Sequence, residues 1–548
     1  MGLTVRLAGV QTTDRFLRLS VELAVERCLA SLDDPAQVAA KVQYLQVDAL
    51  AQLVAVLLRY FDEWKQTTSL TKVTLFKKVL ATVVKHVHSE HAERKAAFNQ
   101  KASHRLLLRL LLDTSDALGD QTQLAFADAL LALQPLLVPG FAFAWLELAS
   151  HKSLMPRLLQ DREKGTAMFS RILLAFFKYM EPFLRSAELH EPVKMLYMGA
   201  LRVLLVLLHD FPEFLCEYHF SLCDAIPPSC IQLRNLILSA FPKEMVLPDP
   251  FTFQERLPPM EATKSPVVAS NYSAALVAFN MRADLDAFLH GRGNRGWLQE
   301  LHSQLLHRNG AEAAASGSRY NIPLLNALVL YTAEFAIAQG AGDKVPVERG
   351  TSMEIYAKLS RDLDKEGRYL LITSMVNHLR YPNSHTHYLS SVLLWLFKSA
   401  GDKELVSGHM TCVWESVMVQ MCNHESMSMH ALARTRVRAH TRTRTRTRTR
   451  TQYQVREQMT RVLIERLIVN KPHPWGLLNT FYELIRNPVS SNRSSWARIL
   501  FVGCAGCKHE KHAAQAVHSW VADQQRTLCA AVLCFACVRA TGSGGQGV

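Results

Sequence analysis

The chain has 548 residues, of which 49% are hydrophobic and 20% charged, and its formal net charge is +14. This composition excludes a wholly disordered chain, a collagen-like chain and a disulfide framework, because apolar residues are abundant while Gly, Pro and Cys number 24, 21 and 11. Residues 407–455 contribute +6 and residues 489–548 contribute +4 to the charge, so the remainder is only mildly basic. Charge alone therefore does not make the bulk of the chain a binder of polyanions.

Helical periodicity dominates residues 1–241, which we expect to form the N-terminal half of an all-α domain. Strand-like alternation is nearly absent, and the stops between helical segments are Pro, Gly and short polar clusters. These features predict an irregular HEAT-like α-solenoid of stacked antiparallel helices. The segments that place apolar residues at three- and four-residue spacing are 53–60, 73–88, 105–113, 172–180 and 196–210.

Two apolar stretches in this half need separate interpretation. Residues 129–146 carry no formal charge, but Pro135, Pro139 and Gly140 interrupt them. We therefore expect two buried helices joined by a turn there, and no membrane partner. Residues 203–208 read VLLVLL, and a helix that is apolar all round is expected to be buried on several sides.

A proline-rich segment divides the helical pattern. Six prolines fall between positions 242 and 266, so we expect residues 242–270 to cross in extended form between two helical halves. The second half is expected at 271–406 and continues at 456–488. Its clearest helical segments are 326–337, 353–364, 369–379 and 388–399, with a looser stretch at 340–350.

Residues 407–455 break the pattern with eight Arg and only two Glu, including a strict Thr-Arg alternation up to Thr451. One interpretation is a phosphate-binding arm, because clustered Arg binds nucleic acid through counterion release. The other is translation of a simple DNA repeat in retained non-coding sequence, which would also explain why the insertion splits a helix. We favour the second interpretation and expect this low-complexity insertion to be disordered.

The tail, residues 489–548, ends in TGSGGQGV and is also expected to be disordered. It contains two Cys-x2-Cys pairs, at Cys504 and Cys507 and at Cys534 and Cys537, a spacing that superficially suits tetrahedral zinc. Their surroundings lack the turn pattern of a zinc ribbon, so we predict no metal site there.

A second cluster of metal-ligating residue types lies near the end of segment 73–88. His88 and His91 share one helix face, but His86 lies off it, and Glu90 does not complete a ligand set. A solvated helix end is the simpler interpretation. The chain also shows no Gly-rich phosphate loop, nucleophile elbow or usable carboxylate pair, so the sequence predicts neither an enzyme nor a bound cofactor.

Six long strings occur in order along the chain. They are PGFAFAWLELASH (139–151), HDFPEFLCEYHFSLCDAIPPSCIQLRNLILSAFP (209–242), RYNIPLLNALVLY (319–331), DLDKEGRYLL (362–371), LRYPNSHTHY (379–388) and EQMTRVLIERLIVNKPHPWGLLNTFYELIRNP (457–488). They resemble the C-terminal region of subunit one of the CCR-NOT transcription complex, the scaffold of the eukaryotic deadenylase. The resemblance extends from about residue 13 to 406 and from 456 to 488, so the insertion and the tail look like intronic translation.

The resemblance implies a non-catalytic scaffold. It implies docking of subunits two and three of the complex, the NOT-box proteins, and of short linear peptides from RNA-binding repressors such as Nanos. The implied outcome is mRNA deadenylation, decay and translational repression, with mRNA contacted indirectly, in the cytoplasm including P-bodies and in the nucleus. It implies no small-molecule substrate.

Two groups of residues within the matching strings are candidates for partner binding. The aromatic group could line a partner groove or could simply pack the core, and it comprises Phe211, Phe214, Tyr218 and Phe220. The second group contains Arg380, Tyr381 and Asn383, which are expected at a solvent-facing turn or a binding surface. It also contains His385 and His387, which are expected to be loop or capping residues or part of a partner-facing surface.

Overall fold

A computed structural model of the protein describes residues 10–61, 71–185, 189–250, 261–340, 350–399 and 446–486. Within these ranges the regular structure is helical, and the only β-type pairing is an isolated bridge between Leu306 and Tyr320. The prediction of an all-α fold is therefore confirmed. The chain divides into two compact units, Met1–Leu393 with Val462–Leu478, and Leu394–Arg461 with Asn479–Val548.

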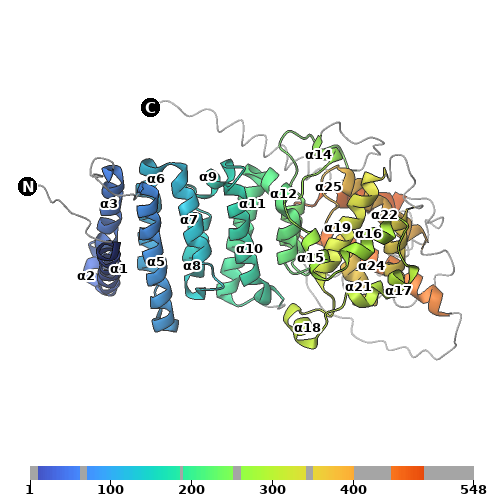
Figure 1. Ribbon diagram of the computed structural model, residues 1–548, viewed down its shortest axis with the longest axis horizontal. Coiled ribbons are helices and arrows are strands. Elements are labelled where there is room, and N and C mark those ends of the chain that lie inside the picture. The colour runs from blue at the N-terminus through green and yellow to red at the C-terminus, as the bar shows by residue number, and fades with distance from the viewer. Residues whose placement is uncertain are drawn as a thin grey trace, which may run out of the picture. The chain divides into compact units, whose positions relative to one another are not determined.

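The first unit begins with long helices packed side by side (Figure 1). Helix α3 packs against α6, α1 packs against α3 and α5, and α5 packs against α7. The periodic segments predicted at 53–60, 73–88 and 105–113 lie inside this group. Its members are α1 (Val10–Asp33), α2 (Pro35–Ala39), α3 (Leu45–Arg59), α5 (Lys72–Arg94), the 3-10 helix η1 (Lys95–Ala97), α6 (Lys101–Leu118) and α7 (Asp120–Ala132).

The uncharged stretch 129–146 forms two helices joined by a turn, as its prolines predict. Helix α7 ends at Ala132, Pro139 opens a short 3-10 helix, and α8 follows. Trp145 is fully buried, and its indole N–H donates a 2.7 Å hydrogen bond to the Leu130 carbonyl across the turn. The elements that follow α7 are η2 (Pro139–Phe141), α8 (Ala142–Ala149), α9 (Met155–Gln160), α10 (Gly165–Leu184), α11 (Glu191–Asp210), α12 (Pro212–Ala225) and α13 (Ile231–Leu238).

Helix α11 differs from its predicted burial. Leu204 and Leu207 are fully buried, but Leu205 is 49% exposed and Val206 is 40% exposed. The prediction of burial on several sides is wrong, because the neighbours of α11, which are α8, α10, α12 and α13, leave one side uncovered. By length and composition alone, α11 could cross a membrane, and 28% of its most apolar window is buried. The absence of a membrane partner stays a prediction.

The proline-rich segment is non-helical over residues 241–250. The indole N–H of Trp475 donates a 2.7 Å hydrogen bond to the Pro248 carbonyl, which anchors this stretch. The expected division of the domain at 242–270 stays a prediction. Residues 261–264, inside the segment expected to be extended, form the short helix α14 (Glu261–Lys264), so that expectation is wrong there; no proline falls within these four residues to prevent a helical turn. The helices after the segment are α15 (Ser273–Ala278), α16 (Arg282–Leu289), α17 (Arg295–Gln304), α18 (Gly310–Ser316), α19 (Ile322–Ala338), α20 (Thr351–Asp362) and α21 (Lys365–Val376).

Side-chain caps set where several of these helices begin. Asn321 accepts a 3.1 Å hydrogen bond from the Leu324 N–H at the start of α19, and Asp364 accepts one of 2.9 Å from the Gly367 N–H at the start of α21. Such caps satisfy N–H groups that have no partner inside the helix. Helix α19 is the most apolar of this group and is buried along most of its length, in contact with α12, α15, α20 and α21.

The last helices of the described residues are α22 (Ser384–Ser399), α24 (Arg446–Ile468) and α25 (Trp475–Arg486). Residues 446–455, which were expected to be disordered as part of the insertion, are helical and form the first part of α24. The remainder of the insertion, residues 407–445, and the tail, residues 489–548, lie outside the described residues.

Candidate partner-binding site

The predicted aromatic group lies on α12 and the residue before it. Phe214 is 4% exposed, and its ring packs 5.6 Å from that of Phe169 on α10 and 5.0 Å from that of Tyr218. Phe220 is also buried, whereas Phe211 and Tyr218 are half-buried. The core-packing alternative therefore describes Phe214 and Phe220. Partner binding by this group stays a prediction.

The connection between α21 and α22 carries the second predicted group and turns inward. Arg380, Tyr381 and Asn383 are 1%, 4% and 0% exposed, so the expected solvent-facing turn is wrong. The physical reason is a local cap, because the Asn383 side-chain oxygen accepts a 3.0 Å hydrogen bond from the Thr386 N–H and its amide donates one of 2.8 Å to the Tyr381 carbonyl. The rest of the turn then packs against the core.

His385 and His387 occupy the first turn of α22 but point to different surroundings. His385 is 4% exposed, and its Nε2 lies 3.8 Å from Oε1 of Glu334 on α19. His387 is exposed. The two histidines therefore do not act together, and only His387 is accessible to a partner in this conformation.

The structure brings the two predicted groups together. The Arg380 guanidinium donates a 2.9 Å hydrogen bond from Nη1 to the Cys216 carbonyl of α12, across 164 positions of sequence. His378 packs between the groups, with its ring centroid 5.7 Å from that of His219 and 6.3 Å from that of Phe220. We call the contact formed by Cys216, His219, Phe220, His378, Arg380 and His385 the buried seam.

Burial determines the protonation states of the buried seam. Burial and the nearby Arg380 cation lower the pKa of His385 to about 3, and they lower the pKa values of His219 and His378 well below the usual 6.5. Burial also raises the pKa of the Cys216 thiol to about 12. At neutral pH the three imidazoles are uncharged and the thiol is protonated, so Cys216 is not an activated nucleophile.

A second buried polar group ties residues 462–478 to the rest of the first unit. The side-chain oxygen of Asn377 accepts hydrogen bonds from Arg234 Nη1 at 3.3 Å and from Arg466 Nη2 at 2.6 Å. Arg234 also donates to the Pro227, Cys223 and Ile226 carbonyls. Burial, with Arg234 nearby, lowers the pKa of Arg466 to about 10. Sequence reasoning missed this group of Arg234, Asn377 and Arg466, because a buried arginine carries no periodic signal in the sequence.

The histidines of α5 have separate neighbours. His88 Nε2 lies 2.9 Å from the Ala132 carbonyl, and the His91 ring packs against Phe98. His86 Nε2 lies 3.7 Å from a Glu90 oxygen, and Glu90 is only 5% exposed, so the predicted solvated helix end is wrong at this residue. No group of three His, Cys, Asp or Glu side chains suited to a metal occurs in the part of the chain that the structure describes. The four tail cysteines lie outside it.

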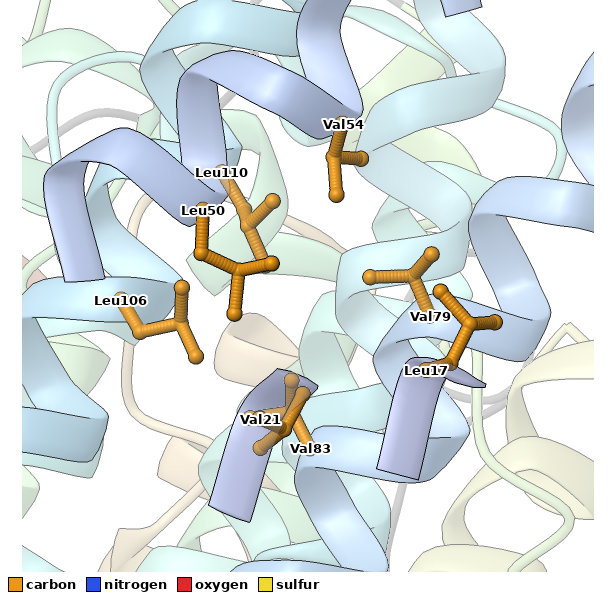
Figure 2. Close-up of a pocket in the computed structure, with 8 residues that line it drawn as sticks. All are labelled: Leu17, Val21, Leu50, Val54, Val79, Val83, Leu106 and Leu110. Carbon is orange, nitrogen blue, oxygen red and sulfur yellow. The ribbon is translucent and has the colours of Figure 1, made fainter. Parts of the chain in front are cut away.

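A small apolar cavity lies between α1, α3, α5 and α6 (Figure 2). The enclosed space measures about 10 Å³, which is barely room for one water molecule. The side chains that converge on it are all aliphatic: Leu17, Val21, Leu50, Val54, Val79, Val83, Leu106 and Leu110. This cavity is a packing gap within the helical core and has no room for a ligand.

One accessible apolar surface that sequence reasoning missed lies on α11. Met195 and Met198 are 60% and 46% exposed, and Leu205 and Val206 are exposed about two to three turns further along. Arg202 lies between these two pairs and is exposed. We call these five residues the α11 face. Positions 195, 198, 202, 205 and 206 lie on one side of a helix, but the buried positions of α11 have the same three- and four-residue spacing, so the sequence carries no signal that separates the two sides.

Comparison with known families identifies long matching regions. A family model described as "CCR4-Not complex component, Not1" matches residues 113–421 and 440–493. The break in that match, residues 422–439, falls inside the predicted insertion.

Two curated relatives agree with this match. The *Caenorhabditis elegans* protein named CCR4-NOT transcription complex subunit let-711 is 35% identical over 534 residues, which is 91% of this chain and 18% of the relative. General negative regulator of transcription subunit 1 of *Schizosaccharomyces pombe* is 33% identical over 86% of this chain and 20% of its own length. The chain thus spans about a fifth of the length of these curated relatives.

The fold also matches solved structures. The NOT1 superfamily homology domain from *Chaetomium thermophilum* aligns with a TM-score of 0.72 and 25% identity, over 93% of this chain and 91% of that domain. A Not1 C-terminal domain solved in complex with Not4 has the same fold, with a TM-score of 0.65 and 24% identity over 88% of this chain and 89% of that one.

Proposed function

Because the chain belongs to the Not1 family of CCR4-Not complex components, we propose that it acts as a non-catalytic scaffold on which other subunits of that complex dock. Family membership is the observation that carries this proposal. The packing of long helices side by side also supports it, because stacked-helix arrays offer extended surfaces on which partner chains bind.

The proposed partners are the NOT-box proteins, subunits two and three, together with short peptides of repressors such as Nanos. The Not1 C-terminal domain that shares this fold binds Not4 in its solved complex, which supports docking on this part of a Not1 protein. By gathering these partners the chain would promote mRNA deadenylation, decay and translational repression, in the cytoplasm including P-bodies and in the nucleus. Phe211 and Tyr218, which are half-buried, and the exposed His387 are the predicted contact residues that remain accessible.

The alternative function is direct binding of nucleic acid. The observation that favours it is the set of eight Arg within residues 407–455, of which three lie in the described part of α24. Clustered Arg would give affinity that falls steeply with salt.

One experiment separates the two functions. Purified chain and a variant with those eight Arg replaced by Gln are each tested for capture of purified subunits two and three, and for binding of labelled RNA by fluorescence anisotropy. The scaffold proposal predicts equal capture of the subunits by both proteins. RNA binding that disappears in the variant, without capture of either subunit by the original chain, would favour the alternative and contradict the scaffold.

A further inference from the structure

The α11 face places large apolar side chains on the outward side of a packed helix. Helix α11 packs inward through Leu196, Ala200, Val203, Leu204 and Leu207, which are all buried. Its opposite side presents four large apolar side chains that are 40–60% exposed. Outward faces of packed helices normally carry polar residues, and a contiguous apolar stripe of this kind marks an interaction surface.

The charges on α11 indicate which chemistry a partner would need. Glu191 pairs with Lys194 at 3.6 Å near the start of the helix, and Asp210 lies 2.7 Å from the His209 ring at its end. Arg202, in the middle of the face, forms no ion pair or hydrogen bond within the described ranges. The centre of the apolar stripe is therefore positive and uncompensated.

We propose that the α11 face docks an amphipathic helical segment of a partner polypeptide, with apolar side chains at three- and four-residue spacing and a carboxylate that pairs with Arg202. This inference rests on the proposed function and names the surface and the kind of segment involved. A partner helix would cover Met195 and Met198 on one side of Arg202 and Leu205 and Val206 on the other.

Two physical features support this occupant. Methionine side chains are flexible and polarisable, so they adapt to apolar residues of different shapes. Docking of an amphipathic helix onto an apolar helix face through residues at i, i+3, i+4 and i+7 is a recurring mode of peptide recognition. A carboxylate facing Arg202 would fix the register of the bound helix by charge complementarity.

The probe is a fluorescein-labelled helical peptide of roughly 18 residues, or five turns. It carries Leu on one face with a Glu between the Leu pairs, and a twin peptide carries Lys in place of that Glu. Affinity is measured by anisotropy with the full chain and with Arg202→Glu and Leu205→Asp. Leu53→Asp is the matched control, because Leu53 is a 43% exposed leucine on α3, away from the face. Circular dichroism verifies that each variant is folded.

We expect the Glu peptide to bind the full chain and the Leu53→Asp control alike, and to bind Leu205→Asp about ten-fold more weakly. Arg202→Glu is expected to reverse the preference, so that the Lys peptide binds better than the Glu peptide. Absence of saturable binding would overturn the proposal, as would binding that ignores Leu205→Asp or a charge preference that Arg202→Glu does not reverse.

Two further measurements identify a different occupant. Self-association of the full chain that Leu205→Asp abolishes would assign the face to a second copy, and co-sedimentation with lipid vesicles that the same variant abolishes would assign it to a membrane. Either result overturns the proposal. Capture of subunits two and three by a chain that fails to bind the peptide would refute the α11 docking site while leaving the scaffold function intact.

Discussion

Replacing His385 by Gln is expected to make the protein less sensitive to acid. His385 is 4% exposed, and burial with the nearby Arg380 lowers its pKa to about 3, from an ordinary 6.5. Because the folded-state pKa is lower than the unfolded-state pKa, the unfolded chain binds the extra proton at intermediate pH. The stability that His385 contributes is present above pH 6.5 and is lost progressively as the pH falls toward 3.

The size of the effect follows from the shift. A pH of 4.5 lies about two units below the ordinary histidine pKa, and each unit is worth about 1.4 kcal/mol. Burial of a neutral His385 therefore lowers the free energy of unfolding at pH 4.5 by about 3 kcal/mol relative to pH 8. His219 and His378 shift in the same direction and add to the loss in both proteins. Burial raises the pKa of Glu334, which acts in the opposite direction and is also common to both.

The assay is equilibrium urea unfolding followed by circular dichroism at pH 8 and pH 4.5. The original chain is expected to lose about 3 kcal/mol more than His385→Gln between the two pH values. His387→Gln is the matched control, because His387 lies two residues away on the same helix but is exposed, and it should behave as the original chain does. Equal losses in the original chain and His385→Gln would refute the assignment of a buried, neutral His385.

Three further substitutions and one control substitution test buried contacts, each by urea unfolding at neutral pH. Asn377→Leu leaves one N–H group of Arg234 and one of Arg466 without their acceptor, so the free energy of unfolding should fall by about 3 kcal/mol. An unchanged urea midpoint would contradict these two hydrogen bonds. Gly476→Ala would place a Cβ 2.8 Å from the Arg380 carbonyl oxygen, and it should lower the free energy of unfolding by about 2 kcal/mol. Gly310→Ala is its control, because a Cβ there meets open space, and it should leave that free energy unchanged or raise it by about 0.5 kcal/mol. Val83→Ile adds a methylene beside the cavity of Figure 2 and should stabilise by about 0.5 kcal/mol; a loss would show that the gap cannot accept it.

Local patterns in the sequence predicted the helices well. The periodic segment at 172–180 lies within α10, and the prolines of 129–146 mark the turn between α7 and α8. Both features depend on neighbours three or four residues apart, or on the local geometry of proline. Periodicity did not reveal which side of α11 its neighbours leave open, because that depends on where α8, α10, α12 and α13 pack.

The candidate site was predictable only in part. The sequence singled out both the aromatic residues of α12 and the turn that contains Arg380. It did not predict that they come into contact in the buried seam, because that contact joins positions 164 residues apart and no local pattern indicates it. Arg380 looked like a surface residue because a buried, uncompensated cation is costly. Its hydrogen bond to the Cys216 carbonyl and the cap at Asn383, which turns the backbone inward, place it in the core.

The most direct test of the scaffold function is size-exclusion chromatography with light scattering on the full chain mixed with purified subunits two and three. We expect one complex whose mass equals the sum of the three chains, and the same complex when the eight arginines of residues 407–455 are replaced by Gln. Three separate peaks at the masses of the individual proteins would contradict the scaffold function.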